Sequence, residues 1–157
     1  MDSLDILTKS AEETKKLGEK LACEIMIEVG LLSLKKTALV VSLEGELGAG
    51  KTTFTQGFAK GLGIKENPRS PTFVIMRAYE IKNSDRFANF IHIDAYRIAS
   101  KDMKTLGWDE FSKKPGNIIL IEWGNRIKNI LPKKSLIISF GHIGHKDKRL
   151  IRICQYE

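Results

Sequence analysis

The sequence is poor in cysteine and contains no long apolar run. Its 157 residues include only Cys23 and Cys154, which are too few for a disulfide framework or a zinc site and which suit a reducing compartment. No apolar stretch approaches the roughly 20 residues that a membrane-spanning helix needs. Residues 1–8 carry two aspartates and no basic segment, so they do not predict a secretory signal. We therefore expect a cytoplasmic protein that does not act at a membrane.

The sequence also lacks internal repeats, low-complexity tracts and any linker rich in Pro, Gly or Ser. A length of 157 residues suits one domain, and a hydrophobic content of 42 % is enough for a real core. We predict a single domain over residues 1–157. Lys and Arg number 26 against 19 Asp and Glu, which gives a net charge of +7. That charge is typical of proteins that bind anions such as nucleotides or RNA, and also of Lys-rich proteins that are merely soluble.

Helical and strand patterns alternate along the chain. Ser10 and Glu13 have the spacing of a capping box, and apolar residues at every fourth position from Leu17 predict a helix that ends at Gly30. The strongest strand patterns are continuously apolar, as in buried parallel strands, and the last two strands are expected to form a hairpin. The order predicts an α/β fold around a mainly parallel sheet with some antiparallel strands. Further helices are predicted at residues 51–61, 102–111 and 126–131, and strands at residues 37–43, 73–81, 87–93, 117–121, 135–140 and 150–154.

The segment from residue 45 to residue 52 reads GELGAGKT and fits the pattern G-x-x-x-x-G-K-[ST] between a predicted strand and a predicted helix. Glycines let the backbone curl around phosphate oxygens, and the helix directs its positive N-terminus at the same anion. Lys51 would reach the β- and γ-phosphates, and the hydroxyl of Thr52 would bind Mg²⁺. Thr53 either adds a hydroxyl to the α-phosphate or faces solvent. This context predicts a P-loop NTPase-like three-layer fold whose nucleotide-binding residues are Gly48, Ala49, Gly50, Lys51, Thr52 and Thr53.

Two predicted strands end in a carboxylate. Residues 118–122 are four apolar residues followed by Glu122, a pattern that places an acid near the Mg²⁺ of a nucleotide site. Residues 90–94 end in the same way at Asp94. The pattern does not rank the two acids as metal ligand or as the group that orients a nucleophilic water, and a surface Glu at a strand end is the alternative for Glu122. His92 is interpreted as a packed histidine without a catalytic role.

Several shorter motifs accompany the glycine-rich loop in a fixed order. Over about residues 10 to 141 the sequence resembles the bacterial TsaE (YjeE) family, the ATPase component of tRNA threonylcarbamoyladenosine biosynthesis. Glu46, where the family often has Asp, and Ala95, in place of a larger apolar residue, are mild departures that do not touch the chemistry. The other motifs that carry the resemblance are residues 13–18, 70–73 (Ser-Pro-Thr-Phe), 92–97 (His-Ile-Asp-Ala-Tyr-Arg), 106–107 and 121–123 (Ile-Glu-Trp).

The resemblance implies an ATPase that uses ATP and Mg²⁺. Lys51 and the backbone of the loop would hold ATP, and Thr52 and Glu122 would bind Mg²⁺. Asp94 would be a catalytic or water-mediated acid.

Two further residues have both a functional and a plain structural interpretation. The resemblance implies that Thr72, in a loop stiffened by two prolines, senses the γ-phosphate; otherwise it simply starts a strand. Trp123 either packs near the nucleotide base or is a core or interface residue.

Partner proteins are also implied by the resemblance. In this family the ATPase works with TsaB and TsaD, whose complex transfers a threonylcarbamoyl group to tRNA. We expect hydrolysis to be slow without these partners and tRNA to be reached through the complex, and we expect no DNA partner.

Positive charge is concentrated in the C-terminal quarter of the chain. The absence of interleaved aromatic residues favours solvated side chains over a surface for tRNA or a partner protein. Two other functions compete with the ATPase subunit. A small-molecule kinase built on the same loop ought to show an Arg-rich lid and an acceptor pocket, and a nucleotide- or RNA-binding module without turnover would not need both Lys51 and Glu122. The basic residues concerned are Lys133, Lys134, Lys146, Lys148, Arg149 and Arg152.

Overall fold

The computed structural model describes residues 2–28, 36–68, 74–144 and 146–157. Within them, the strands are β1 (Ser3–Thr8), β2 (Leu39–Glu44), β3 (Met76–Glu80), β4 (Asn89–Asp94), β5 (Asn117–Glu122), β6 (Leu136–His142) and β7 (Arg149–Gln155). The helices are α1 (Ala11–Ile27), α2 (Lys51–Gly61), α3 (Ser100–Thr105), α4 (Trp108–Phe111) and the 3-10 helix η2 (Gly124–Ile130). None of the helices in the described part of the chain is long and apolar enough to cross a membrane.

The described strands form one sheet in the order β1-β7-β6-β2-β5-β4-β3. The four central strands, β6, β2, β5 and β4, are parallel neighbours, and every residue of β5 is buried. Burial on both faces explains why these strands are continuously apolar. The edges are antiparallel, since β3 pairs with β4 on one side and β7 and β1 follow β6 on the other. The predicted α/β fold with a mainly parallel centre is confirmed.

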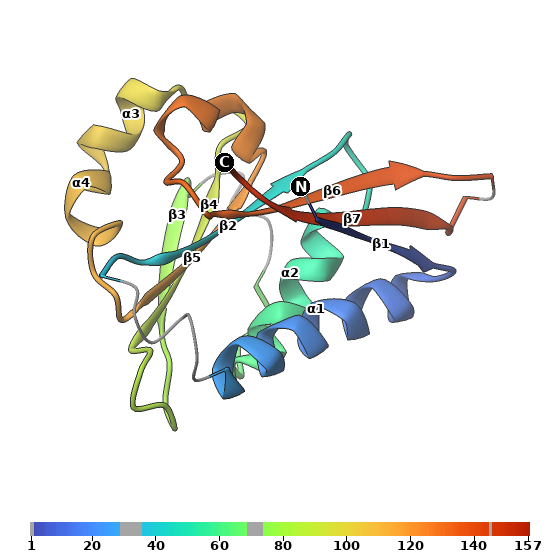
Figure 1. Ribbon diagram of the computed structural model, residues 1–157, viewed down its shortest axis with the longest axis horizontal. Coiled ribbons are helices and arrows are strands. Elements are labelled where there is room, and N and C mark those ends of the chain that lie inside the picture. Colours follow the sequence, from blue (N-terminus) through green and yellow to red (C-terminus); the bar gives the residue numbers. More distant parts are fainter. Residues whose placement is uncertain (1, 29–35, 69–73, 145) are drawn as a thin grey trace.

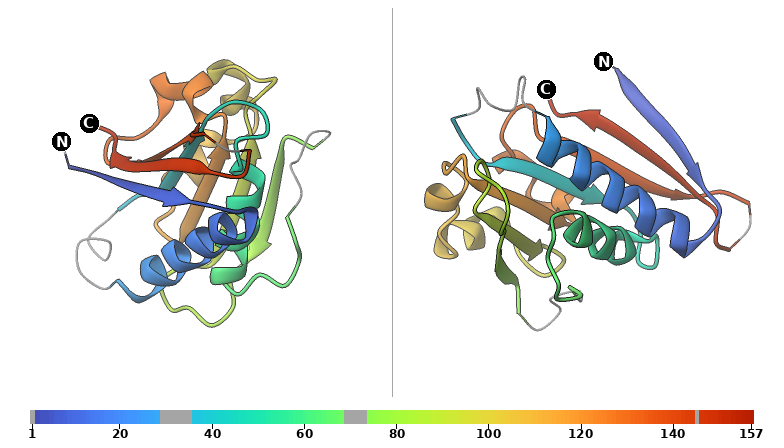
Figure 2. Two further views of the ribbon diagram at one scale, coloured as in Figure 1. Left: turned by 90° about the vertical axis from the view of Figure 1, so that its right-hand side faces the viewer. Right: turned by 90° about the horizontal axis from the view of Figure 1, so that it is seen from below.

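Helices cover both faces of the sheet, so the fold has three layers (Figures 1 and 2). Helices α1 and α2 pack together on one face over a cluster that includes the fully buried Phe54, Phe58 and Phe90. The two helices approach so closely that a Cβ atom on Gly57 would lie 1.8 Å from the carbonyl oxygen of Lys15. On the opposite face, α3, α4 and η2 cover a second apolar cluster. Each fully buried Phe contributes roughly 1.5–3 kcal/mol relative to an exposed one.

Several predicted boundaries are confirmed. Helix α2 has the predicted bounds, β6 and β7 form the predicted hairpin, and Ser10 is the N-cap of α1, its hydroxyl accepting from the amide of Glu13 at 3.1 Å. The Glu13 carboxylate accepts from the amide of Lys9 at 2.6 Å instead of from Ser10. Helix α1 ends at Ile27 with Glu28 as its C-cap, and Gly30 lies outside the described residues.

Other predicted elements are corrected by the structure. The helix predicted at residues 102–111 is two short helices, because Gly107 has a left-handed φ of 97° between them. The strand predicted at residues 73–81 begins at Met76, and Phe73 lies outside the described residues. Strand β1 was not predicted at all. Its partner β7 is at the other end of the chain, Ser3 facing Cys154, so local sequence carries little of the signal.

Candidate functional site

The glycine-rich loop connects β2 to α2 at the carboxyl edge of the parallel strands. Gly48 has φ 77° and Gly50, the N-cap of α2, has φ 104°, conformations that favour glycine. The amide of Ala49 donates to the carbonyl oxygen of Glu46 at 3.1 Å and closes the turn. Lys51 then begins the helix. The positive end of α2 therefore faces the region beyond the ends of the strands, an arrangement suited to anions.

Lys51 is only 5 % exposed and is held inside the loop. Its Nζ donates to the carbonyl oxygens of Gly45 at 2.6 Å and Glu46 at 2.7 Å, and it lies 4.0 Å from the centre of the Trp123 ring. Burial lowers the pKa of Lys51, while the nearby carboxylate of Glu122 opposes that shift. The ammonium group is thus a largely desolvated cation that is held by two loop carbonyls.

Glu122 has two side-chain partners in the site. Its Oε1 accepts from the hydroxyl of Thr52 at 3.0 Å, and its Oε2 lies 2.7 Å from Nε2 of His92. Glu122 is 2 % exposed and His92 is fully buried. Nδ1 of His92 has no hydrogen-bond partner among the described residues. The carboxylate therefore joins the start of α2 to the interior of the sheet.

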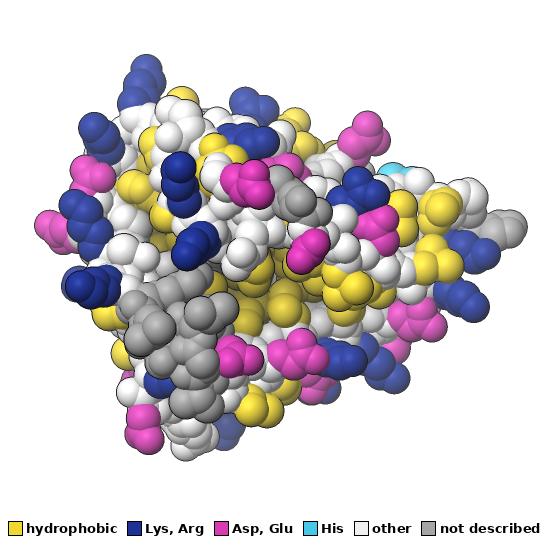
Figure 3. Space-filling view, in the orientation of Figure 1, with side chains coloured by type: hydrophobic (Ala, Val, Ile, Leu, Met, Phe, Trp, Pro, Cys, Tyr) yellow, Lys and Arg dark blue, Asp and Glu magenta, His cyan; other side chains and the backbone are white. Residues whose placement is uncertain are grey.

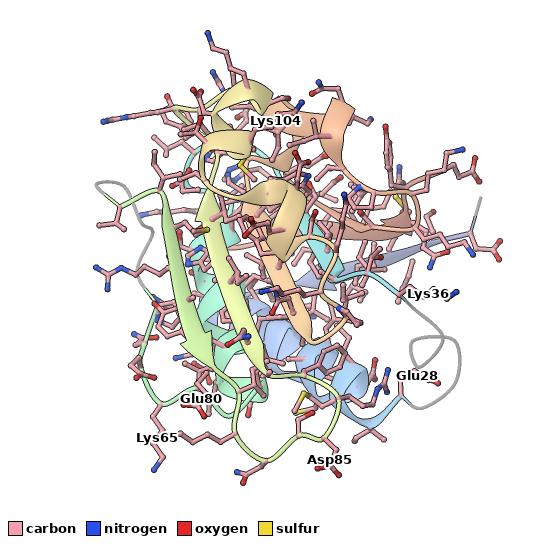
Figure 4. The ribbon with its side chains drawn as sticks, turned by 90° about the vertical axis from the view of Figure 1, so that its left-hand side faces the viewer. Glu28, Lys36, Lys65, Glu80, Asp85 and Lys104 are labelled. Carbon is pink, nitrogen blue, oxygen red and sulfur yellow. The ribbon has the colours of Figure 1, made fainter. Side chains whose placement is uncertain are left out.

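Asp94 ends the neighbouring strand and faces Glu122 in the register of β4 and β5. One carboxylate oxygen accepts from the amide of Tyr96 at 2.9 Å. The Tyr96 ring lies 4.9 Å from the ring of Trp123. Asp94 and Glu122 are the last residues of the parallel strands β4 and β5, so both lie at the carboxyl edge of the sheet. Figure 4 labels Glu80 and Asp85 at the opposite end, near the amino end of β4.

A cavity of about 540 Å³ lies at this edge. It is bounded by the loop, the ends of β4 and β5, the start of α1 and the hairpin between β6 and β7. Both polar and apolar residues line it: Ala11, Thr14, Leu47, Gly48, Gly50, Lys51, Thr52, Thr53, Asp94, Tyr96, Arg97, Glu122, Trp123, Asp147 and Arg149.

The sequence and the fold are similar to those of known proteins. A protein-family model described as "Threonylcarbamoyl adenosine biosynthesis protein TsaE" matches residues 8–151. The chain belongs to the TsaE family. The tRNA threonylcarbamoyladenosine biosynthesis protein TsaE of Bacillus subtilis (strain 168) is 36 % identical over 150 residues, which is 96 % of this chain and 85 % of that protein.

A further relative by sequence and a solved structure are also similar to most of this chain. The protein of the same name from Haemophilus influenzae is 30 % identical over 154 residues, 98 % of this chain and 90 % of that protein. The crystal structure of Bacillus subtilis YdiB has a TM-score of 0.73 at 33 % identity and covers 99 % of this chain and 87 % of that one. The three-layer fold described above is therefore shared along nearly the whole chain.

In this TsaE-family chain the predicted site residues largely come together. Ala49 is fully buried and contributes only its backbone. Thr72, with the rest of residues 70–73, lies outside the described residues. Trp123 lies against Lys51 and adopts a left-handed φ of 63°. It lines the cavity, so it is not only a core residue. The predicted residues that line one cavity are Gly48, Gly50, Lys51, Thr52, Thr53, Asp94, Glu122 and Trp123.

The basic C-terminal quarter does not form one patch. Residues 133–134 precede β6, whereas residues 146–149 follow the other end of that strand. Arg152 pairs with Asp5 of β1, with Nε 2.7 Å from Oδ1. On the face drawn in Figure 3, Lys and Arg side chains are scattered among Asp and Glu side chains. The charge distribution gives no continuous surface for a polyanion on that face.

Sequence reasoning missed two functional candidates, His92 and Arg149. His92 begins one of the motifs that carry the family resemblance, but its contact with Glu122 depends on how the strands are paired. The guanidinium of Arg149 donates to the carbonyl oxygens of Ala49 at 3.0 Å and Gly48 at 3.2 Å. A contact between residues about a hundred positions apart leaves no mark in a local pattern.

Proposed function

We propose that this chain is an ATP-binding, Mg²⁺-dependent ATPase subunit of the machinery that makes threonylcarbamoyladenosine in tRNA, and that it acts with TsaB and TsaD. The observation that carries the proposal is the convergence of the glycine-rich loop, Lys51, Thr52 and two strand-end carboxylates on one cavity. Its volume of about 540 Å³ is in the range of small-molecule sites, roughly 300–1,000 Å³. Membership of the TsaE family supports the pathway.

Binding of a nucleotide requires Lys51 to change partners. Its Nζ donates to two loop carbonyls, of Gly45 and Glu46, and these bonds are exchanged for bonds to phosphate oxygens. Because the ammonium group is already desolvated, little further hydration is lost when an anion arrives. The amides of the loop and the N-terminus of α2 complete the cradle.

The donor set beside the loop fits Mg²⁺. The hydroxyl of Thr52 and the carboxylate of Glu122 are hard oxygen ligands, and they lie 3.0 Å apart at the edge of the cavity. Magnesium bound there with a nucleotide supplies neutralisation of the charge that develops on the transferred phosphoryl group. Thr52 and Glu122 would hold it, and His92 keeps the Glu122 carboxylate in place.

Asp94 is the candidate for orienting the attacking water. Its carboxylate lines the cavity at the end of β4, and the amide of Tyr96 fixes one of its oxygens. Arg97 lines the same cavity and is a candidate cation for the transition state. Trp123 and Tyr96 form an aromatic wall at which the base of a nucleotide could stack.

Steady-state phosphate release tests the proposal. We expect slow release by the chain alone and at least about tenfold faster release with TsaB and TsaD, because a P-loop enzyme without a well-placed transition-state cation is slow and a partner can supply one. Thr72→Ala is expected to reduce the response to the partners. Rapid hydrolysis that partners do not change would contradict the coupling, and ATP-dependent transfer to a small acceptor without phosphate release would favour the kinase.

A further inference from the structure

Arg149, the first residue of β7, uses all three nitrogens of its guanidinium on backbone carbonyls. Nε donates to Ala49 at 3.0 Å and Nη2 donates to Gly48 at 3.2 Å, both in the glycine-rich loop. Nη1 donates to Lys148 at 3.0 Å and also to Lys146, both in its own hairpin. The side chain is therefore a fork that joins the hairpin to the loop.

The two loop carbonyls belong to the peptide units that also contain the amides of Ala49 and Gly50, so holding them fixes the direction of those two amides. In a trans peptide the C=O and the N–H of one unit point in opposite directions, and the described residues contain no cis peptide bond. Holding the oxygen of Ala49 toward Arg149 therefore turns the amide of Gly50 away from it. Since Gly48 and Gly50 have little conformational preference of their own, the bonds from Arg149 add an external hold to the internal one, the bond from the Ala49 amide to Glu46.

The backbone of Arg149 is held in place by the sheet. Arg149 faces Thr8 of β1 and His142 of β6 in the register of the sheet, so its backbone is paired on both sides. The hydroxyl of Thr8 is bonded to that of Thr14 at 2.8 Å, and Thr14 lines the cavity at the start of α1. The loop is thus held from outside the segment that carries the motif.

We propose that Arg149 is a positioning residue that keeps the amides of the glycine-rich loop in the orientation that binds phosphate. The inference rests on the proposed function for the identity of the ligand, a nucleoside polyphosphate. Lysine cannot replace it, because a single ammonium group does not offer the planar fork that serves the loop and the hairpin at once.

Amide hydrogen exchange of the nucleotide-free protein tests the positioning directly. The amide of Ala49 donates to Glu46, so its exchange reports the shape of the loop. We expect exchange at residues 46–50 to be at least about tenfold faster in Arg149→Ala and intermediate in Arg149→Lys. The matched control is Arg152→Ala on the same strand, which loses its bond to Asp5 and leaves loop exchange unchanged. Unchanged exchange in Arg149→Ala overturns the proposal.

Nucleotide affinity separates positioning from direct contact with the phosphates. Because the loop amides serve phosphates that ADP and ATP share, we expect Arg149→Ala to weaken both by a similar factor, at least about tenfold by calorimetric titration. Weakening of ATP alone overturns the proposal and assigns Arg149 to the γ-phosphate. If wild-type protein binds neither nucleotide, the proposed function fails while the exchange measurement still decides the positioning. If Arg149→Ala does not fold, Arg149→Lys carries both measurements.

Discussion

Strands β4 and β5 end side by side in carboxylates, but the surroundings of the two acids differ. Glu122 on β5 is 2 % exposed and is bonded to Thr52 and His92. Asp94 on β4 is partly exposed and accepts from the amide of Tyr96, two residues further along its own chain. Glu122 is tied to the start of α2, and Asp94 is bonded to the backbone just past the end of its own strand.

We infer from this difference that the two acids do different work in the proposed site. A carboxylate that shares a hydrogen bond with Thr52 lies where the motif places the metal, so Glu122 belongs on the Mg²⁺ side of the proposed site. A partly exposed carboxylate at the cavity wall can reach water, so Asp94 belongs on the side of the nucleophile. Two similar strand-end patterns thus lead us to propose two roles, because the neighbouring elements differ.

The largest expected effect is on turnover. Glu122→Gln and Asp94→Asn should each lower phosphate release by about 100-fold or more at saturating ATP and Mg²⁺, the usual scale for a lost acid or base. Nucleotide affinity should change far less, because the loop amides and Lys51 make most ground-state contacts. A variant that hydrolyses at the wild-type rate has lost no catalytic group, which would remove that residue from the mechanism.

Magnesium dependence should then separate the two variants. Glu122→Gln is expected to raise the Mg²⁺ concentration for half-maximal turnover by roughly 10- to 100-fold, as for other disturbed metal ligands. Asp94→Asn should leave that concentration unchanged and lower only the maximal rate. Equal Mg²⁺ requirements in the two variants would contradict the assignment.

His92 should act through Glu122 and not through Asp94. His92→Gln keeps a side-chain nitrogen near Oε2 but loses the rigid ring, and we expect roughly tenfold weaker Mg²⁺-dependent turnover. Combined with Glu122→Gln it should add little, whereas combined with Asp94→Asn its effect should add in full. The opposite pattern in the double-mutant cycles would place His92 on the side of Asp94.

The smallest expected effect is on the pKa of Lys51. Burial lowers this pKa, and the carboxylates of Glu122 and then Asp94 raise it. Glu122→Gln should therefore lower the pKa of Lys51 further than Asp94→Asn does, as measured by the NMR titration of its side-chain carbon beside Nζ. Since the pKa is lower in the folded state than in the unfolded chain, the unfolded chain binds more protons between the two values. Stability should rise with pH across that interval, and Lys51→Met should remove the rise.

Local pattern was sufficient for the loop, α2 and the apolar central strands, because each carries its signal in consecutive residues. It did not rank Glu122 and Asp94, since their difference comes from Thr52 and His92 across the sheet. Strand β1 and the role of Arg149 were missed for the same reason: both depend on contacts between the two ends of the chain. The pattern at residues 102–111 also predicted one helix where there are two, because Gly107 adopts a left-handed φ that interrupts it.

Calorimetric titration of ATP and Mg²⁺ into the wild-type chain and into folded Lys51→Met tests whether the cavity is a nucleotide site. We predict binding to the wild type and at least about tenfold weaker binding to the variant, because Lys51 is the desolvated cation that would reach the phosphates. Circular dichroism of the variant confirms that it is folded. Wild-type affinity in Lys51→Met, or no binding to the wild-type chain, would contradict a nucleotide site in this cavity.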